Sequence, residues 1–220
     1  LETKASLAYF LSSLILQGMG MITLPFFSRL MSSDQIGIVT IYNSWYSILG
    51  TIATLSLYSG AMNVAMVEFS EDRDGYQSSI IALSALASLV FAGLFLLFYP
   101  AIMDFVKLPK VLVYTMLLGF VVQPAQAHWL TRKRFEFEYK SSSIVTVVSS
   151  LLATFSAIYF VHYASKKGCH NLAEVRILAM AVVSYTIAGF FFVQILLRGR
   201  KLYSKEYWKF ALSINIPLII

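Results

Sequence analysis

The chain has 220 residues, of which 58% are hydrophobic and only 13% are charged, and its mean hydropathy is +0.73. Soluble domains carry about 25% charged residues, so this composition argues against an ordinary soluble protein and favours a membrane protein. The net charge of +6 does not indicate nucleic-acid binding, because the basic residues lie in short loops between apolar runs.

Six apolar runs follow one another, each about twenty residues long and so able to cross a hydrocarbon core of about 30 Å as an α-helix. We expect spans at residues 6–28, 37–60, 77–99, 110–130, 142–163 and 177–197, and a seventh run begins near residue 208. The sequence therefore predicts an all-α, polytopic transmembrane helix bundle. Residues 1–200 are expected to form a six-helix N-terminal lobe, and residues 201–220 a cytoplasmic connection and the start of helix seven. Because the chain lacks an initial Met and stops inside an apolar run, we expect a longer protein whose C-terminal lobe is missing here.

The first predicted span carries a short polar face made of Ser13, Gln17 and Gly20, and it ends near Arg29. Polar groups inside a span turn toward other helices or water, so Gln17 is a candidate cavity residue. Two interpretations of Arg29 stay open. It reaches the membrane interface as a long cationic side chain does, or it contacts a phosphate or sugar acid of a substrate.

The second predicted span carries a continuous polar stripe, because its polar residues recur at spacings of three and four. The stripe consists of Thr40, Asn43, Ser47, Gly50, Thr51 and Thr54. It is either a packing face whose hydroxyls bond back to their own helix or one wall of a water-filled cavity. Asn43, Ser47 and Thr51 are the cavity candidates, and the amide of Asn43 favours the cavity because back-bonding satisfies an amide poorly.

Two other spans carry only small residues at a spacing of four. These are Ser84, Ser88 and Ala92 in the third span, and Ser149, Ala153 and Ala157 in the fifth. Small side chains let helix backbones approach closely, so both rows are expected to be helix contact surfaces.

The fourth span carries a shorter polar face made of Gly119, Gln123 and Gln126, and both glutamines are further cavity candidates. His128 follows, and its unperturbed pKa near 6.5 makes it a candidate proton relay. The alternative for His128 is a plain position at the membrane interface, beside Trp129.

Basic residues set the expected orientation. Eleven Lys and Arg residues lie on the side of the N-terminus and six on the other side. Because Lys and Arg are retained in the cytoplasm, the sequence predicts a cytoplasmic N-terminus.

Catalytic and metal-binding patterns are absent from the sequence. No Asp or Glu lies inside any of the six spans, and there is no nucleophile with a base, no HExxH and no phosphate-binding glycine loop. Cys169 beside His170 gives two ligand types where a metal site needs three or four. We therefore expect no enzyme activity, no metal and no cofactor.

Two stretches carry a resemblance to a known family. The segment AYFLSSLILQGMGMITLPFFSRLMSSDQIG at Ala8–Gly37 resembles the first helix and turn of polysaccharide or O-antigen flippases (Wzx-type). These belong to the multidrug/oligosaccharidyl-lipid/polysaccharide exporter superfamily. The segment KEYWKFALSINIPLII at Lys205–Ile220 is similar to the family's start of helix seven, and Ser59-Gly60 is a third short match.

The resemblance implies a transporter of two six-helix lobes around a central cavity, located in the bacterial cytoplasmic (inner) membrane. Its implied substrate is an undecaprenyl-diphosphate-linked oligosaccharide, which it flips to the outer leaflet for surface polysaccharide biosynthesis. The implied partners are this lipid-linked oligosaccharide, membrane lipids and other polysaccharide assembly proteins, and no nucleic acid. The alternatives are a multidrug-type exporter of the same superfamily and a non-transporting scaffold of a polysaccharide assembly complex.

Overall fold

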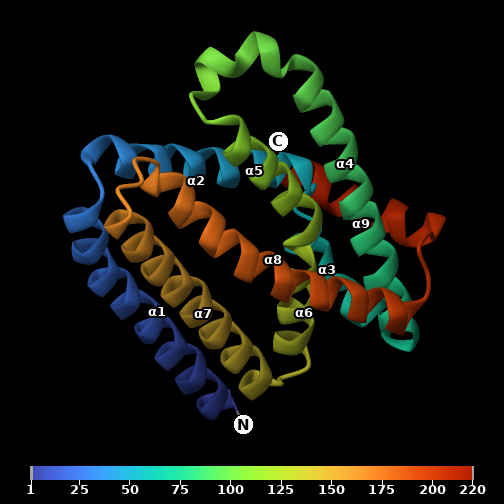
Figure 1. The fold of residues 1–220 in the computed structure, drawn as a ribbon. Coiled ribbons are helices and arrows are strands. Elements are labelled where there is room, and N and C mark those ends of the chain that lie inside the picture. Colours follow the sequence, from blue (N-terminus) through green and yellow to red (C-terminus); the bar gives the residue numbers. More distant parts are fainter. Residues whose placement is uncertain (1, 220) are drawn as a thin grey trace.

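The structure is a computed structural model that describes residues 2–219, and side chains are described for residues 7, 9–101 and 103–217. Residues 2–219 contain helices and loops and no strand (Figure 1). The helices are α1 (Glu2–Leu30), α2 (Ser33–Ala53), α3 (Gly60–Glu68), η1 (Ser70–Asp72), α4 (Arg73–Val106), α5 (Lys110–Val122), α6 (Pro124–Phe135), α7 (Tyr139–Lys166), α8 (Leu172–Gly199) and α9 (Lys205–Ile219).

Five helical segments among the described residues are long and apolar enough to cross a membrane, as expected of a multi-pass membrane protein. They are Tyr9–Leu30, Ser70–Ala101, Lys110–Phe135, Tyr139–Lys166 and Leu172–Gly199. These match five of the six predicted spans, so the prediction of an all-α fold with several helices able to cross a membrane is confirmed. The remaining predicted span falls on α2, which is not among the five, and the polar stripe lowers its hydropathy. A six-helix lobe therefore stays a prediction.

The second predicted span is not one continuous helix. α2 ends at Ala53, and a turn at residues 54–59 separates it from α3. Leu55 and Ser56 adopt φ values of 53° and 46°, which a continuing right-handed helix does not allow. The sequence contains neither Gly nor Pro before Gly60 in this turn, so the usual signals of a helix break are missing.

A second break separates α5 from α6 at Pro124, within a single candidate span. Proline has no N–H, so the carbonyl of Phe120 loses its partner four residues later in the helix. The Ser88 hydroxyl of α4 takes that place and lies 3.0 Å from the Phe120 oxygen. It also lies 3.2 Å from the oxygen of Ala53, where α2 ends. One buried serine therefore contacts both helix breaks.

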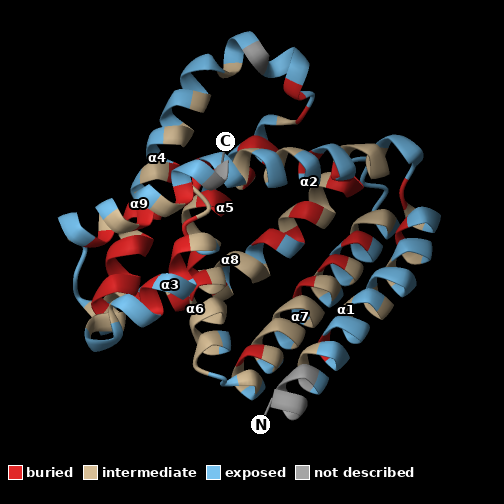
Figure 2. Ribbon diagram, turned by 180° about the vertical axis from the view of Figure 1, so that it is seen from behind, coloured by how far each residue is buried: buried red, intermediate tan, exposed pale blue. Residues whose placement is uncertain are grey.

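The helices pack in chain-distant pairs. α7 packs between α1 and α8, α4 packs against α5 and α8, and α9 packs against α3 and α4 (Figure 1). Buried residues concentrate in α3, α5, the first half of α4 and part of α9, whereas α1 is largely exposed (Figure 2). The exposed residues of α1 include Phe10, Leu14, Met21 and Ile22, which form a surface that lipid would cover.

The two rows of small residues behave as expected. Ser84 and Ser88 on α4, and Ala153 and Ala157 on α7, are buried, whereas Ala92 and Ser149 at the ends of the rows are half-buried. The rows are helix contact surfaces.

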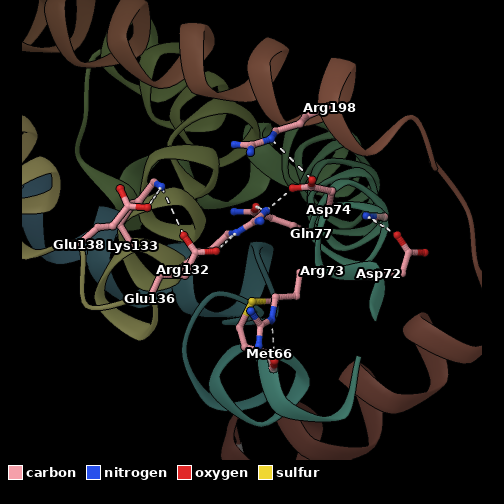
Figure 3. A network of polar contacts seen from close by, with 11 residues as sticks. Met66, Asp72, Arg73, Asp74, Gln77, Arg132, Lys133, Glu136, Glu138 and Arg198 are labelled. Atoms are coloured by element: carbon pink, nitrogen blue, oxygen red, sulfur yellow. Dashed lines mark hydrogen bonds and ion pairs between the residues drawn. The ribbon is translucent and has the colours of Figure 1, made fainter. Parts of the chain in front are cut away.

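Three loops predicted to lie on one side of the membrane meet at one end of the molecule through ion pairs (Figure 3). Arg132 at the end of α6 pairs with Asp74 at the start of α4. Arg198 of α8 lies 3.6 Å from the same carboxylate, and Lys201 beyond α8 lies 2.8 Å from Asp72. The ends of α6 and α8 are thereby attached to the start of α4.

Acidic residues beyond α6 complete this network. Glu136 lies 2.8 Å from Arg132 and 3.3 Å from Lys133, and Lys133 lies 2.7 Å from Glu138. Burial alone would raise the pKa of Glu136, but the adjacent Arg132 and Lys133 hold that pKa below its usual range. Glu136 is therefore ionised at neutral pH.

Candidate functional site

The polar face of α2 forms one wall of a groove whose other walls come from α5, α6 and α8. The groove consists of three adjoining cavities that share lining residues, and we call it the polar groove. Asn43, Tyr46 and Gln123 line both the first and the second cavity, and Tyr58 and Ala127 line both the second and the third. From Val39 of α2 to Thr54, the residue that caps it, the chain follows the groove over roughly 22 Å at 1.5 Å per residue.

The first cavity has a volume of about 190 Å³ and lies where α8 begins. We call it the Arg176 cavity, after its one lining residue that carries a charge. Its other lining residues are Val39, Tyr42, Asn43, Tyr46, Gln123, Ile177, Met180, Ala181, Ser184 and Tyr185. Hydroxyl and amide groups thus surround a single cation.

The middle cavity has a volume of about 400 Å³ and lies between α2 and the α5–α6 break. Its walls are Asn43, Tyr46, Ser47, Gly50, Thr51, Thr54, Tyr58, Gly119, Phe120, Gln123, Pro124 and Ala127. The kink at Pro124 places Gln123 opposite the polar face of α2, so both helix walls present polar groups.

The third cavity has a volume of about 480 Å³ and lies beside the start of α3. Its walls are Tyr58, Ser59, Asn63, Ala127, Leu130, Thr131 and Arg134. The Thr131 hydroxyl donates to the Tyr58 carbonyl over 3.3 Å and so holds α6 against the turn that follows α2. The polar groove therefore has an arginine in each terminal cavity and, in its described lining, no carboxylate.

Two tyrosines of the groove meet at a glycine, and a third, Tyr42, lies beside one of them. The Tyr46 and Tyr185 hydroxyls both occupy the space that a Cβ on Gly119 would need. Tyr185 donates to the Thr115 carbonyl over 2.8 Å, and the Tyr42 and Tyr46 rings lie 5.9 Å apart. A glycine on α5 thus lets α2 and α8 approach it closely and fixes the aromatic wall of the groove.

The two interpretations of the α2 stripe both describe part of the structure. The Thr51 hydroxyl donates to Ser47 and the Thr54 hydroxyl to Gly50, at 3.0 and 2.8 Å, which is back-bonding within the helix. Both residues nevertheless line the middle cavity. A threonine that donates to its own helix keeps lone pairs as acceptors, so back-bonding leaves the groove wall polar.

Four of the residues predicted as cavity candidates lie together in the polar groove. Asn43 and Gln123 line two of its cavities, and Ser47 and Thr51 line the middle one. The sequence predicted that these groups share a cavity, and the structure brings them together from two helices.

The other predicted residues lie elsewhere. Gln17 and Arg29 are exposed on α1, which packs on α7 and contributes no lining residue. Gln126 donates to the Ser149 hydroxyl over 3.3 Å and so links α6 to α7. Gln126 lies three residues after Gln123, so its side chain points in a different direction around the helix and meets α7.

His128 is fully buried, and neither ring nitrogen has a hydrogen-bond partner within the described part of the chain. Its ring centroid lies 6.4 Å from that of Tyr58, which lines the groove. His128 therefore lies behind the groove wall and not at an exposed membrane interface.

Sequence reasoning missed the aromatic and cationic part of the site. Tyr42, Tyr46 and Tyr185 carry no separate signal, because aromatic residues occur equally at lipid and interface positions. Arg176 lies just outside the predicted sixth span, which begins at residue 177, whereas α8 begins at Leu172. The signal for Arg176 is its spacing of four and eight residues from Met180 and Ser184, which places it on their face of a helix.

The lining of the groove has the chemistry of ligand binding. Among the described residues no group of three or more His, Cys, Asp or Glu side chains could hold a metal ion, and Cys169 is exposed. Neutral hydrogen-bonding groups and aromatic faces dominate the groove, a combination that suits ligands rich in hydroxyl groups.

No protein-family model, curated protein or solved structure matches the chain.

Proposed function

We propose that the protein is a membrane transporter that flips an undecaprenyl-diphosphate-linked oligosaccharide across the bacterial cytoplasmic membrane for surface polysaccharide assembly. The observation that carries the proposal is the continuous polar groove along α2, lined by hydroxyls, amides and tyrosines. Sugars need many hydrogen-bond partners, and a groove of this kind supplies them while the lipid tail stays in the bilayer. The described helices then form one lobe of the carrier, with a cytoplasmic N-terminus and the ion-pair network of Figure 3 on the cytoplasmic side.

The lining of the groove argues against the two alternative functions, a drug exporter and a scaffold. A carrier of cationic drugs benefits from a carboxylate in its cavity, and none lines the described groove. A scaffold needs no cavity, and hydrocarbon packing would favour apolar residues where Asn43 and Gln123 stand.

The direct test is a flipping assay with the full-length protein in proteoliposomes. A fluorescent undecaprenyl-diphosphate-linked oligosaccharide is loaded, and a membrane-impermeant quencher reports the fraction in each leaflet. We expect Asn43→Leu to lower the initial rate about fivefold or more, because an uncharged hydrogen bond contributes about 1 kcal/mol. Ser44→Ala is the matched control, since Ser44 is exposed on the same helix, lines no part of the groove and donates to Thr40.

The proposal fails if the wild-type protein leaves the labelled lipid in its original leaflet. Movement of a cationic dye without movement of the lipid would assign the groove to a drug exporter. If neither the labelled lipid nor the dye moves, the protein is a non-transporting scaffold.

A further inference from the structure

Neither arginine of the groove has a counter-ion among the described residues, but only Arg176 has a buried nitrogen without a hydrogen-bond partner. Its side chain is half-buried, and its Nε is buried without a hydrogen-bond partner. No ion pair joins Arg176 to any carboxylate of the described chain. Burying an unpaired charge is unfavourable, so the folded protein retains a group that an anion would stabilise.

Other arginines of the molecule show what a structural role looks like. The Arg132 guanidinium bonds Asp74, Gln77 and Glu136. Arg73 donates to the Met66 carbonyl over 2.9 Å and lies over the Phe135 ring. Both have protein acceptors for their donors, whereas Arg176 has none among the described residues.

The orientation of Arg176 is nevertheless fixed. Its guanidinium carbon lies 3.9 Å from the centroid of the Phe27 ring of α1, a distance typical of cation–π contact. This contact holds the guanidinium against the ring, and its N–H donors lie in the guanidinium plane. The side chain lines the first cavity together with Asn43, Gln123 and Tyr185. A rigid fork of donors therefore borders a polar cavity.

We propose that Arg176 is an oxyanion-binding residue of the polar groove, taking a phosphate or carboxylate group of the transported molecule. A guanidinium fork matches the oxygens of either group through two parallel hydrogen bonds, and the neighbouring amides and hydroxyls complete the ligand's hydrogen bonding. This inference rests on the proposed function. It specifies that an anionic part of the substrate, either the lipid diphosphate or an acidic sugar, occupies the Arg176 cavity.

The test measures binding to the purified full-length protein in lipid nanodiscs. One pair of probes is undecaprenyl diphosphate and undecaprenol, which differ only in the phosphates. The other pair is a uronic-acid oligosaccharide and a neutral maltooligosaccharide. We expect Arg176→Gln to weaken binding of one anionic probe about tenfold or more, because a charge-assisted pair is lost, and to leave the neutral probe of that pair unchanged.

Two further variants separate binding from folding. Arg176→Lys keeps the charge and loses the fork, so its affinity is expected between those of the wild type and Arg176→Gln. Lys110→Gln removes an exposed cation at the start of α5 that lines no part of the groove, and it is expected to bind as the wild type does.

The pattern of losses identifies the source of the oxyanion. A loss confined to undecaprenyl diphosphate assigns Arg176 to the lipid diphosphate, and a loss confined to the uronic-acid oligosaccharide assigns it to an acidic sugar. Unchanged binding of both anionic probes to Arg176→Gln, or an equal loss for the neutral probes, would overturn the inference. If that variant also flips the labelled lipid at the wild-type rate, Arg176 has no such role and the proposed function still stands.

Discussion

At the scale of single residues, the buried serines of α4 show how polar groups make a broken helix possible in a membrane. Ser88 supplies a donor near two carbonyls that the breaks at Ala53 and Pro124 leave without helical partners. Ser84, one turn earlier, is equally buried, but its hydroxyl has no partner among the described residues. The two serines therefore form a matched pair, and the loss of each hydroxyl is expected to change the stability by a different amount.

We predict that Ser88→Ala lowers the free energy of unfolding by about 1–3 kcal/mol, because it leaves a buried carbonyl unsatisfied. Ser84→Ala is expected to cost much less, since it removes a hydroxyl that bonds nothing in the described structure. Thermal unfolding of the purified variants in detergent measures the difference. Equal destabilisation by both substitutions would show that Ser88 acts through packing and not through its hydrogen bonds.

The residues of the site were predictable where the helical period alone decides their neighbours. Asn43, Ser47 and Thr51 share a face on any helix, and the structure places them along one groove. Arg29 and Gln17 could not be placed in this way, because periodicity does not say which helix a face will meet. Arg176 needed the start of α8 to within a few residues, and helix boundaries are the least certain part of a sequence prediction.

At the scale of elements, glycines decide where helices approach one another. Gly199 ends α8 against the start of α4, and a Cβ there would overlap the Asp74 carbonyl oxygen and the Ser78 side chain. Gly18 in α1 has open space where a Cβ would stand. The joint between α8 and α4 also carries the Arg198 to Asp74 ion pair.

We predict opposite effects of alanine at these two glycines. Gly199→Ala is expected to destabilise the protein by about 1–3 kcal/mol, because backbone must move to relieve the overlap. Gly18→Ala is expected to stabilise it by roughly 0.5–1 kcal/mol, because alanine restricts the unfolded chain and favours helix. Melting temperatures of both variants check the prediction, and a destabilising Gly18→Ala would mean that α1 has a close neighbour.

The element boundaries show which physical signals a sequence carries. Five predicted spans correspond to candidate membrane spans, because length and apolar composition determine them directly. The break after Ala53 was not predicted, because it depends on Leu55 and Ser56 in an uncommon backbone conformation. The break at Pro124 had an available signal, since an internal proline removes a helical hydrogen bond.

At the scale of the whole molecule, the groove and the charged network have different roles: the network joins helix ends, and the groove is the proposed substrate site. Ion pairs hold the ends of α4, α6 and α8 together at one end. The apolar faces of α1 and the outer half of α4 are exposed, as surfaces in contact with lipid are. Between them, polar residues of α2, α5, α6 and α8 line the groove that we propose carries the substrate.

Thiol accessibility tests this account most directly. Single cysteines are placed at Asn43, Thr51 and Gln123 of the full-length protein, in a Cys169→Ser background because the native cysteine is exposed. Ile48→Cys is the matched control, since Ile48 is exposed on α2 and lines no part of the groove. A water-soluble thiol reagent is then added to cells.

The account predicts labelling at all three groove positions, reduced when substrate accumulates, and no labelling at Ile48→Cys, which faces lipid. Complete protection of Asn43→Cys, Thr51→Cys and Gln123→Cys in every state would contradict it, because the groove would then be a dry contact between helices.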